Sequence, residues 1–156
     1  MKKVFLATVL FAGILFACSK DKFQTKPQLR LKSVSNKLVP VNGTLEVELE
    51  YTDKEGDVDS ILVIRKQRLN IRPVSPTVRD SLKFTVPEFP NKDRGEISMV
   101  LNYQTHLIHA QSPLTIPNSN PAKREPDTLN LKFVLKDKAG NVSDTLIINN
   151  VIVVRQ

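Results

Sequence analysis

The stretch LEVELEY, residues 45–51, alternates apolar and acidic side chains without a break. A strict period of two is typical of a β-strand that buries one face and exposes the other. The same alternation recurs in SLKFTV (81–86), ISMVLNY (97–103) and LNLKFVLKD (129–137). These four stretches therefore predict that antiparallel strands are the main elements of the chain.

Three further stretches complete the predicted set of strands. QLRLKSV (28–34) predicts the first strand, whereas ILVIRKQRL (61–69) and TLIINNVIVV (145–154) contain the continuous apolar runs expected where both faces are covered. No window has a helical period with caps, and 10 prolines interrupt the chain. About seven strands in one domain predict an all-β fold, an Ig-like antiparallel β-sandwich. Because the chain has one Cys and no Trp, its core must depend on apolar burial alone.

The first residues have the pattern of an export signal. Positive residues 1–3 precede an apolar run at 4–16, which is too short to span a bilayer, and a small residue, Ala17, precedes Cys18. LFAC, residues 15–18, resembles the bacterial lipobox. This resemblance implies that Cys18 is lipidated on sulfur and becomes the new N-terminus. We therefore expect a signal peptide at 1–17, a lipidated Cys with a polar tether at 18–27, and the sandwich domain at 28–156.

The lone cysteine also bears on where the protein resides. A single thiol cannot form a disulfide within an exported chain, so lipidation explains Cys18 better than pairing does. Several acyl chains hold a protein stably at a membrane that it does not span. Ser19, in place of Asp after the Cys, resembles the sorting signal of enterobacterial lipoproteins that reach the outer membrane. We expect an outer-membrane lipid anchor, with the domain facing the periplasm or the cell surface.

The charge pattern argues against nucleic acid as a partner. The chain carries 23 basic and 16 acidic residues, and removing Lys2 and Lys3 with the predicted signal leaves 21 against 16. These charges are dispersed among strands and loops, whereas a nucleic-acid surface gathers them on one face. With no Trp in the chain, a base-stacking surface is also not expected.

Two loops share the pattern D-K-x-G-[DN]-V, at residues 53–58 and 137–142. Gly56 and Gly140 can adopt the positive φ of a tight turn. The aspartate at the start of each motif can accept a hydrogen bond from the backbone two residues further along the chain. Turn chemistry alone thus explains most of the pattern. The alternative is a Ca²⁺ site, since hard cations take six to eight oxygen ligands. Its candidate ligands are Asp53, Glu55, Asp57, Asp59, Asp137 and Asp144.

Topology favours the calcium hypothesis, because loops after the second and sixth strands of an Ig-like sandwich lie at the same end. Lys54 and Lys138 within the loops oppose it, as does a spacing that departs from the EF-hand pattern. In YTDKEGDVDS (51–60) and KDKAGNVSDT (136–145), the chain resembles Ig-like modules of Bacteroidota envelope lipoproteins. That resemblance implies an Ig-like domain held at the cell envelope.

The connection at residues 105–127 is long for a compact domain and contains four prolines. Such a segment is a functional loop, a mobile segment or a sign of a missed strand. Its apolar residues Leu107, Ile108, Leu114 and Ile116 fit either coverage of the sandwich edge or contact with a partner. His106 and His109 do not predict a zinc site, because side chains three apart on an extended chain point to opposite faces and no further ligand completes a shell.

The sequence contains no motif for a common catalytic site. It has no nucleophile elbow, H-E-x-x-H pair, Walker loop or G-x-G-x-x-G turn. We expect a non-catalytic, lipid-anchored envelope protein that acts as an adhesion, scaffold or accessory module. The alternative is a carbohydrate-binding lipoprotein of a nutrient-uptake complex. Sugar-binding surfaces expose aromatic rings, and the candidates for that role are Tyr51, Tyr103 and a few Phe residues.

Overall fold

A computed structural model describes residues 25–156 except 59, 78, 89 and 91. All of the predicted strands are present within this range, as β1 (Gln28–Val34), β3 (Thr44–Thr52), β4 (Ile61–Arg68), β5 (Ser81–Thr85), β6 (Arg94–Asn102), β7 (Asp127–Lys136) and β8 (Leu146–Val153). Two short elements were not predicted: strand β2 (Leu38–Val39) and a single-turn π-helix, η2 (Tyr103–Leu107). The all-β prediction is confirmed.

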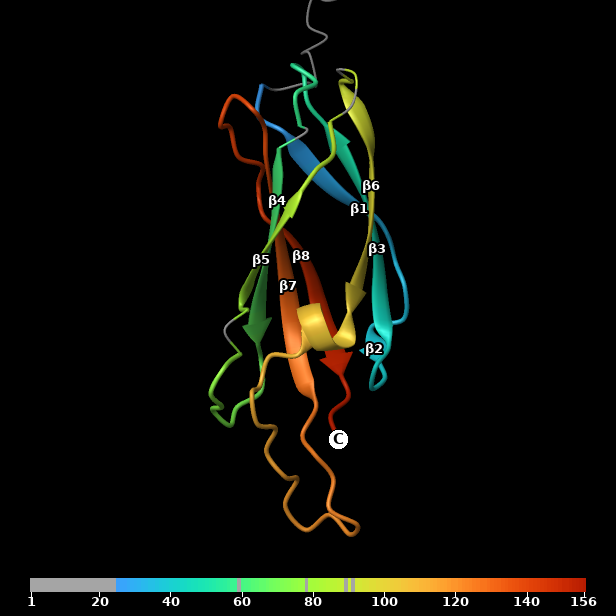
Figure 1. Cartoon of the computed structure of the whole chain (residues 1–156), viewed down its shortest axis with the longest axis vertical. Helices are drawn as coiled ribbons and strands as arrows, with labels where there is room; N and C mark the ends of the chain where they lie inside the picture. The colour runs from blue at the N-terminus through green and yellow to red at the C-terminus, as the bar shows by residue number, and fades with distance from the viewer. Residues whose placement is uncertain (1–24, 59, 78, 89, 91) are drawn as a thin grey trace, which may run out of the picture.

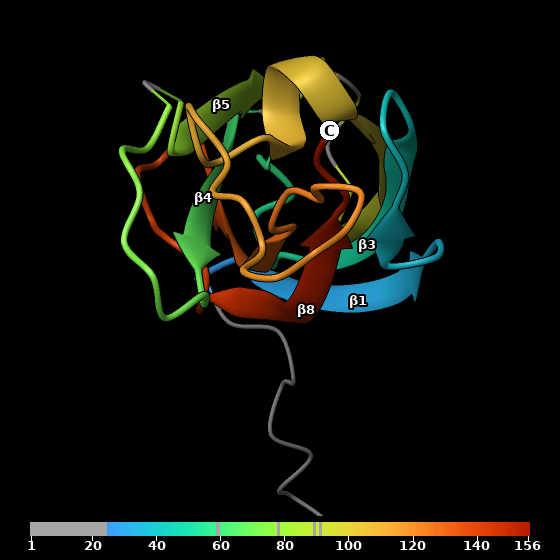
Figure 2. The ribbon, with the colours of Figure 1, turned by 90° about the horizontal axis from the view of Figure 1, so that it is seen from below.

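The strands form two sheets that face each other (Figures 1 and 2). One sheet has the order β1-β3-β6 and the other the order β2-β8-β7-β4-β5. In an Ig sandwich, strands A, B and E share one sheet and C, F and G share the other, and β1, β3, β6 and β4, β7, β8 divide in the same way. Pairing is antiparallel except between β2 and β8, which run parallel. The sandwich is thus antiparallel as predicted, with this two-residue edge strand as the exception.

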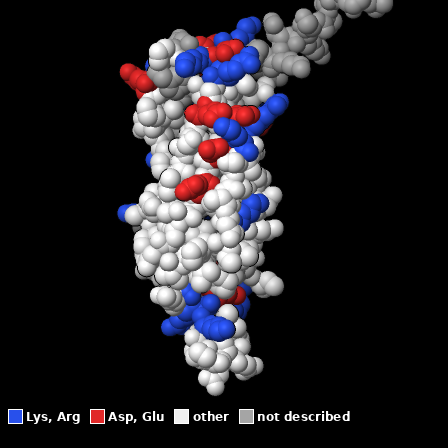
Figure 3. Space-filling view, turned by 90° about the vertical axis from the view of Figure 1, so that its right-hand side faces the viewer, with Lys and Arg blue, Asp and Glu red and all other residues white. Residues whose placement is uncertain are grey.

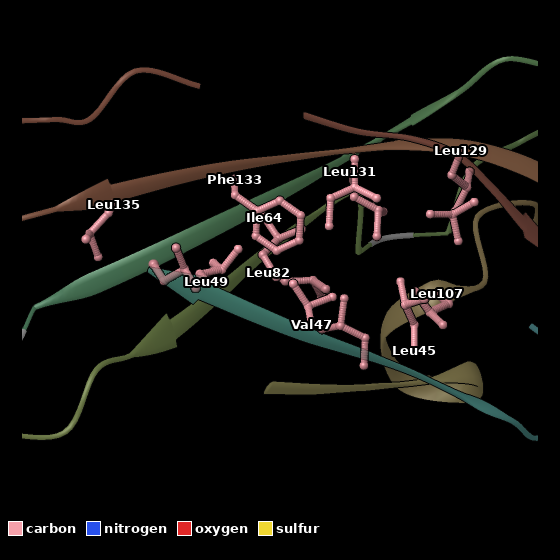
Figure 4. Packing of buried hydrophobic residues seen from close by; sticks show 14 of the residues in the cluster. Leu45, Val47, Leu49, Ile64, Leu82, Leu107, Leu129, Leu131, Phe133 and Leu135 are labelled. Carbon is pink, nitrogen blue, oxygen red and sulfur yellow. The ribbon is translucent and has the colours of Figure 1, made fainter. Parts of the chain in front are cut away.

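The core forms from the alternating residues that the sequence indicated. On β3, every second side chain from Leu45 to Tyr51 is buried, and on β7 the same holds from Leu129 to Leu135. Figure 4 shows the leucines and Val47 of β3 pointing toward the buried side chains of β7, with Ile64 of β4 and Leu82 of β5 between them. Full burial of each such side chain contributes about 1.5–3 kcal/mol. The two inner faces therefore supply the apolar burial that replaces a disulfide.

The ends of the sandwich differ in what they carry. We call the end where the described chain begins the entry end; it holds the loops at 53–58 and 137–145 (Figure 1). There Lys26 forms an ion pair with Asp144, and Asn141 Nδ2 donates to the carbonyl of Thr25. We call the opposite end the loop end, since the segment at 108–126 projects from it (Figure 1). Among the described residues, no helix has the length and apolar character needed to cross a bilayer.

Candidate metal centre

Three carboxylates from two loops meet at the entry end. Asp53 directly follows β3, Asp57 lies in the same loop, and Asp137 directly follows β7. One oxygen from each lies within 4.8 Å of the others, and no other group of three metal-ligating side chains occurs among the described residues. Asp53 and Asp137 are 0% and 1% exposed. The prediction that these two loops lie at the same end is confirmed.

Turn geometry places the aspartates. Gly56 and Gly140 both have positive φ, +69° and +95°, as predicted. A Cβ atom on Gly56 would lie 2.9 Å from the backbone nitrogen of Lys92, so a side chain there would displace a neighbouring strand connection. Asp53 Oδ2 accepts from the Asp57 amide at 3.3 Å. This bond reaches the fourth residue on, rather than the second as the sequence suggested.

The second loop is held more tightly than the first. Asp137 Oδ1 accepts from the Asn141 amide at 2.7 Å, and its Oδ2 accepts from Asn141 Nδ2 at 2.8 Å. The amide of Lys138 donates to the carbonyl of Asp57 at 3.0 Å and so joins the two loops. Asp137 is therefore fixed in direction, with lone pairs still available for a cation.

Two oxygens of the group have no partner. Asp53 Oδ1 and Asp57 Oδ1 are buried and make no hydrogen bond. Burial raises the pKa of Asp53 above its ordinary value of 3.8; the backbone amide of Asp57 opposes this shift, and the Asp57 carboxyl adds to it. Buried polar atoms in proteins are nearly always paired, and a bare buried charge is costly. The carboxylates are thus held together at an electrostatic cost.

The remaining predicted ligands lie elsewhere. Glu55 is exposed and does not belong to the group. The Asp144 side chain is 94% exposed and pairs with Lys26. Asp59 and the predicted lipidation site, Cys18, lie outside the described residues. Of the six predicted calcium ligands, the structure brings together Asp53, Asp57 and Asp137.

At the loop end, the structure contains a buried ionic network that the sequence did not indicate. Asp127 is 0% exposed. Its carboxylate accepts from Arg68 Nε at 3.1 Å and from Arg155 Nη1 at 2.8 Å. It also accepts from the amides of His109 and Ala110. We call Asp127, Arg68 and Arg155 the Asp127 network; it attaches the start of the 108–126 segment to the sandwich.

The long connection is neither structureless nor a missed strand. Leu107 is buried, Ile108 packs against the core, and Ala110 bridges to Pro76. Further along, Thr115 bridges to Arg124, so that the segment doubles back on itself. The first part therefore covers the end of the sandwich, as Figure 2 shows from below, while the second part projects beyond it.

The two histidines of this region are structural in character. His106 Nδ1 accepts from the Asn102 amide at 2.9 Å, and its ring packs edge-on against Phe84. His109 Nδ1 lies 3.1 Å from Asp80 Oδ1, but the two atoms are not aligned for a hydrogen bond. Burial lowers the pKa of both rings. Neither belongs to the described group of metal-ligating side chains.

The candidate sugar-stacking rings that the structure describes are turned inward. Tyr51, Tyr103 and Phe133 are buried, and Phe84 is half-buried beside His106. Within the part of the chain that the structure describes, no Tyr or Phe ring is exposed as a platform. This arrangement gives no support to the carbohydrate-binding alternative.

Comparisons of the chain with protein-family models, with curated proteins and with solved structures each found no match. Function is therefore inferred from the residues and geometry of the chain itself.

Proposed function

We propose that the chain is a non-catalytic, lipid-anchored module of the bacterial cell envelope, whose Ig-like domain serves an adhesion, scaffold or accessory role. One observation carries the proposal: the described chain enters the sandwich at one end, and the 108–126 segment projects from the other (Figure 1). With lipid on Cys18, the tether at 18–27 places the entry end beside the membrane. The projecting segment is then directed away from the membrane, toward a partner in the envelope.

The projecting segment suits presentation to a partner. Residues 111–122 carry no charged side chain and are mostly exposed. Figure 3 shows an uncharged tip beyond a band of Lys and Arg side chains. The base of the segment is fixed by the Asp127 network and by Lys66 Nζ, which donates to the carbonyl of Ile108 at 2.6 Å. A firmly attached base lowers the entropy that contact with a partner would cost.

The serine-lined hollow on the surface lacks the features of a catalytic site. It lies on the outer face of the three-stranded sheet, has a volume of about 330 Å³, and is lined by serines, valines, Met99, Glu46 and Glu48. Ser33 Oγ donates to Glu48 Oε2 at 3.0 Å there, but both side chains are exposed to solvent. A nucleophile needs a base that is itself oriented by a third group, and a site that excludes water. The residues that line this hollow supply neither.

Intact mass tests the anchor. The wild-type protein and Cys18→Ala are expressed in a diderm bacterium and extracted from membranes in detergent. We expect the wild type to have the mass of residues 18–156 plus acyl chains, and we expect this species to be lost in the variant. An unlipidated soluble wild-type product would contradict the proposal.

Fluorescent labels test the orientation. Because lipidation blocks the native thiol, Ser119→Cys and Lys54→Cys each provide one reactive thiol, at the loop end and the entry end respectively. In vesicles with a headgroup quencher, we expect the label at position 54 to be quenched far more than the label at 119. Equal quenching would contradict presentation of the loop end. Maleimide labelling of position 119 on intact cells then distinguishes the cell surface from the periplasm.

A further inference from the structure

We infer that Asp53, Asp57 and Asp137 form a Ca²⁺ site that joins the two loops of the entry end. The inference goes beyond the proposed envelope role and does not depend on it. It rests on two observations. One is the convergence of three carboxylates within 4.8 Å, and the other is the lack of a hydrogen-bond partner for Oδ1 of the fully buried Asp53.

Burial separates this group from an ordinary acidic surface patch. Solvated carboxylates on a loop tolerate one another because water screens their repulsion. Here Asp53 and Asp137 are withdrawn from water, and Asp53 Oδ1 and Asp57 Oδ1 make no hydrogen bond. Charges buried in proteins are paired with other charges or coordinate metals. A cation bound between the carboxylates would provide the missing partner for both oxygens.

The turn alternative explains only part of the geometry. Turn chemistry accounts for the positive φ of Gly56 and Gly140 and for the bonds from Asp53 and Asp137 to backbone amides. It does not account for the contact between the two loops, which brings Asp137 to the two carboxylates of the first loop. It also leaves the Oδ1 atoms of Asp53 and Asp57 unpaired. The two interpretations of the shared motif are therefore compatible. Turn chemistry explains the glycines and the backbone bonds, and a bound cation explains the contact between the loops and the unpaired oxygens.

The ligand set identifies the class of cation. All three side chains offer oxygen, with no Cys or His in the group, which selects hard cations over zinc or copper. Calcium binds oxygen at about 2.3–2.6 Å, so that one ion spans ligands up to about 5.2 Å apart. Magnesium binds at about 2.0–2.1 Å, keeps several waters and is usually held by one or two carboxylates. Three protein carboxylates within 4.8 Å of one another therefore favour calcium.

The site differs from an EF-hand in construction. Its ligands come from two loops that are far apart in the sequence, whereas an EF-hand takes them from one loop. Three carboxylates supply at most six oxygens, and the partly exposed Asp57 leaves one side open to water. Calcium sites of extracellular modules bind with Kd values of about 10⁻⁴–10⁻³ M. We expect an affinity in this range or up to about tenfold tighter, because two of the three carboxylates are buried.

Isothermal titration with CaCl₂ tests the site, using the full chain in detergent after EDTA treatment and dialysis. The test variants are Asp53→Asn and Asp57→Asn. The matched control is Asp144→Asn, which removes a carboxylate at the same end but outside the group. We expect one calcium ion per wild-type chain, at least tenfold weaker binding in both test variants, and unchanged binding in the control. Circular dichroism checks that each variant is folded. If Asp53→Asn does not fold, Asp57→Asn still tests the site, because Asp57 is only partly buried and its replacement should disturb the fold less.

Four outcomes would overturn the inference. The first is no heat and no change in melting temperature for the wild type at 10-fold above the expected Kd. The second is equal calcium binding by the wild type and a folded Asp57→Asn variant. The third is an equal response to MgCl₂, which would remove calcium as the selected ion. Loss of binding in Asp144→Asn alone would place the ion elsewhere at the entry end and would equally contradict this ligand set.

Discussion

Asp53 and Asp127 are both 0% exposed, yet the protein treats them in opposite ways. At the loop end, two arginines and two backbone amides satisfy Asp127. At the entry end, Asp53 accepts from one backbone amide and lies against two further carboxylates, with Oδ1 unpaired. The chain neutralises one buried aspartate with its own cations. It leaves the other to a cation from solution, which is the basis of the calcium inference.

The largest loss of stability is expected when the ion pairs of Asp127 with the two arginines are broken. Asp127→Asn removes the charge that Arg68 and Arg155 share, while both side chains remain only 7% exposed. Breaking a buried ion pair by removing one partner costs about 3–5 kcal/mol. We expect a loss of this size in the free energy of unfolding, measured with urea. A loss below about 1 kcal/mol would mean that the other acceptors, Glu125 for Arg68 and the carbonyl of Ala110 for Arg155, satisfy the arginines without Asp127.

Two glycine substitutions sharpen the description of the entry end. Gly56→Ala would strain a left-handed residue and bring Cβ to 2.9 Å from backbone atoms of Lys92. Gly140→Ala would cause the strain alone, since the nearest neighbour lies at 3.9 Å. Strain in a left-handed residue costs about 1–2 kcal/mol, and overpacking adds about 1–3. We therefore expect Gly56→Ala to lose more unfolding free energy than Gly140→Ala. Equal losses would argue against close packing between this loop and residue 92.

Calcium provides the next contrast between the ends. At about 100 times Kd, a ligand that binds only the folded state adds about 2.7 kcal/mol to the free energy of unfolding. We expect this gain in the wild type and in Asp127→Asn, provided that the variant folds, and a gain of at most about 1.4 kcal/mol in Asp53→Asn, where binding is at least tenfold weaker. Urea unfolding with CaCl₂ and with EDTA measures the difference. A full calcium gain in Asp53→Asn would show that this carboxylate does not bind the ion.

A smaller effect is expected from acid at the loop end. The pKa of His106 is lowered by burial and then by Arg79 and Lys66, and its Nδ1 accepts a backbone hydrogen bond. Its neutral form therefore contributes stability that is present above the unfolded-state pKa of 6.5 and is lost as pH falls through the lower folded-state pKa. Between pH 7.5 and 5 we expect a decline below about 1 kcal/mol, since solvent screens a partly exposed ring. The decline should be smaller in His106→Gln; an identical decline would assign it to other groups, including His109.

The smallest effect is expected for the exposed ion pair. Asp144→Asn removes the partner of Lys26 at the surface of the entry end. Exposed pairs contribute about 0–1 kcal/mol. We expect urea unfolding of this variant to match the wild type within about 0.5 kcal/mol. A larger loss would show that the contact of residues 25–27 with the sandwich stabilises the fold.

Local patterns predicted what depends on local geometry. Alternation in LEVELEY and LNLKFVLKD identified strands and core residues, because the side-chain period of a strand is two. The shared D-K-x-G motif identified both positive-φ glycines. β2 and η2 are too short to have a period. The parallel pairing of β2 with β8 depends on residues more than a hundred positions apart.

The direction of side chains and the pairing of distant residues were harder to predict from the sequence. Asp144 looked like a calcium ligand by composition, but its side chain turns outward to Lys26. The Asp127 network joins residues separated by 59 and 28 positions, and no local pattern marks Arg68 or Arg155 as buried. A Pro before Asp127 and an Arg at the chain end are signals too common to identify it. Distant partners such as these come together only once the sheets have formed.

The most direct test compares Asp53→Asn with Asp127→Asn in urea unfolding at pH 7 with EDTA. Each variant replaces a buried carboxylate by an amide of the same shape, so the measured difference reports on charge pairing. We expect Asp127→Asn to lose several kcal/mol and Asp53→Asn to be as stable as the wild type or more so, because it removes an uncompensated charge. A comparable loss in both variants would contradict the claim that the protein leaves the charge of Asp53 uncompensated.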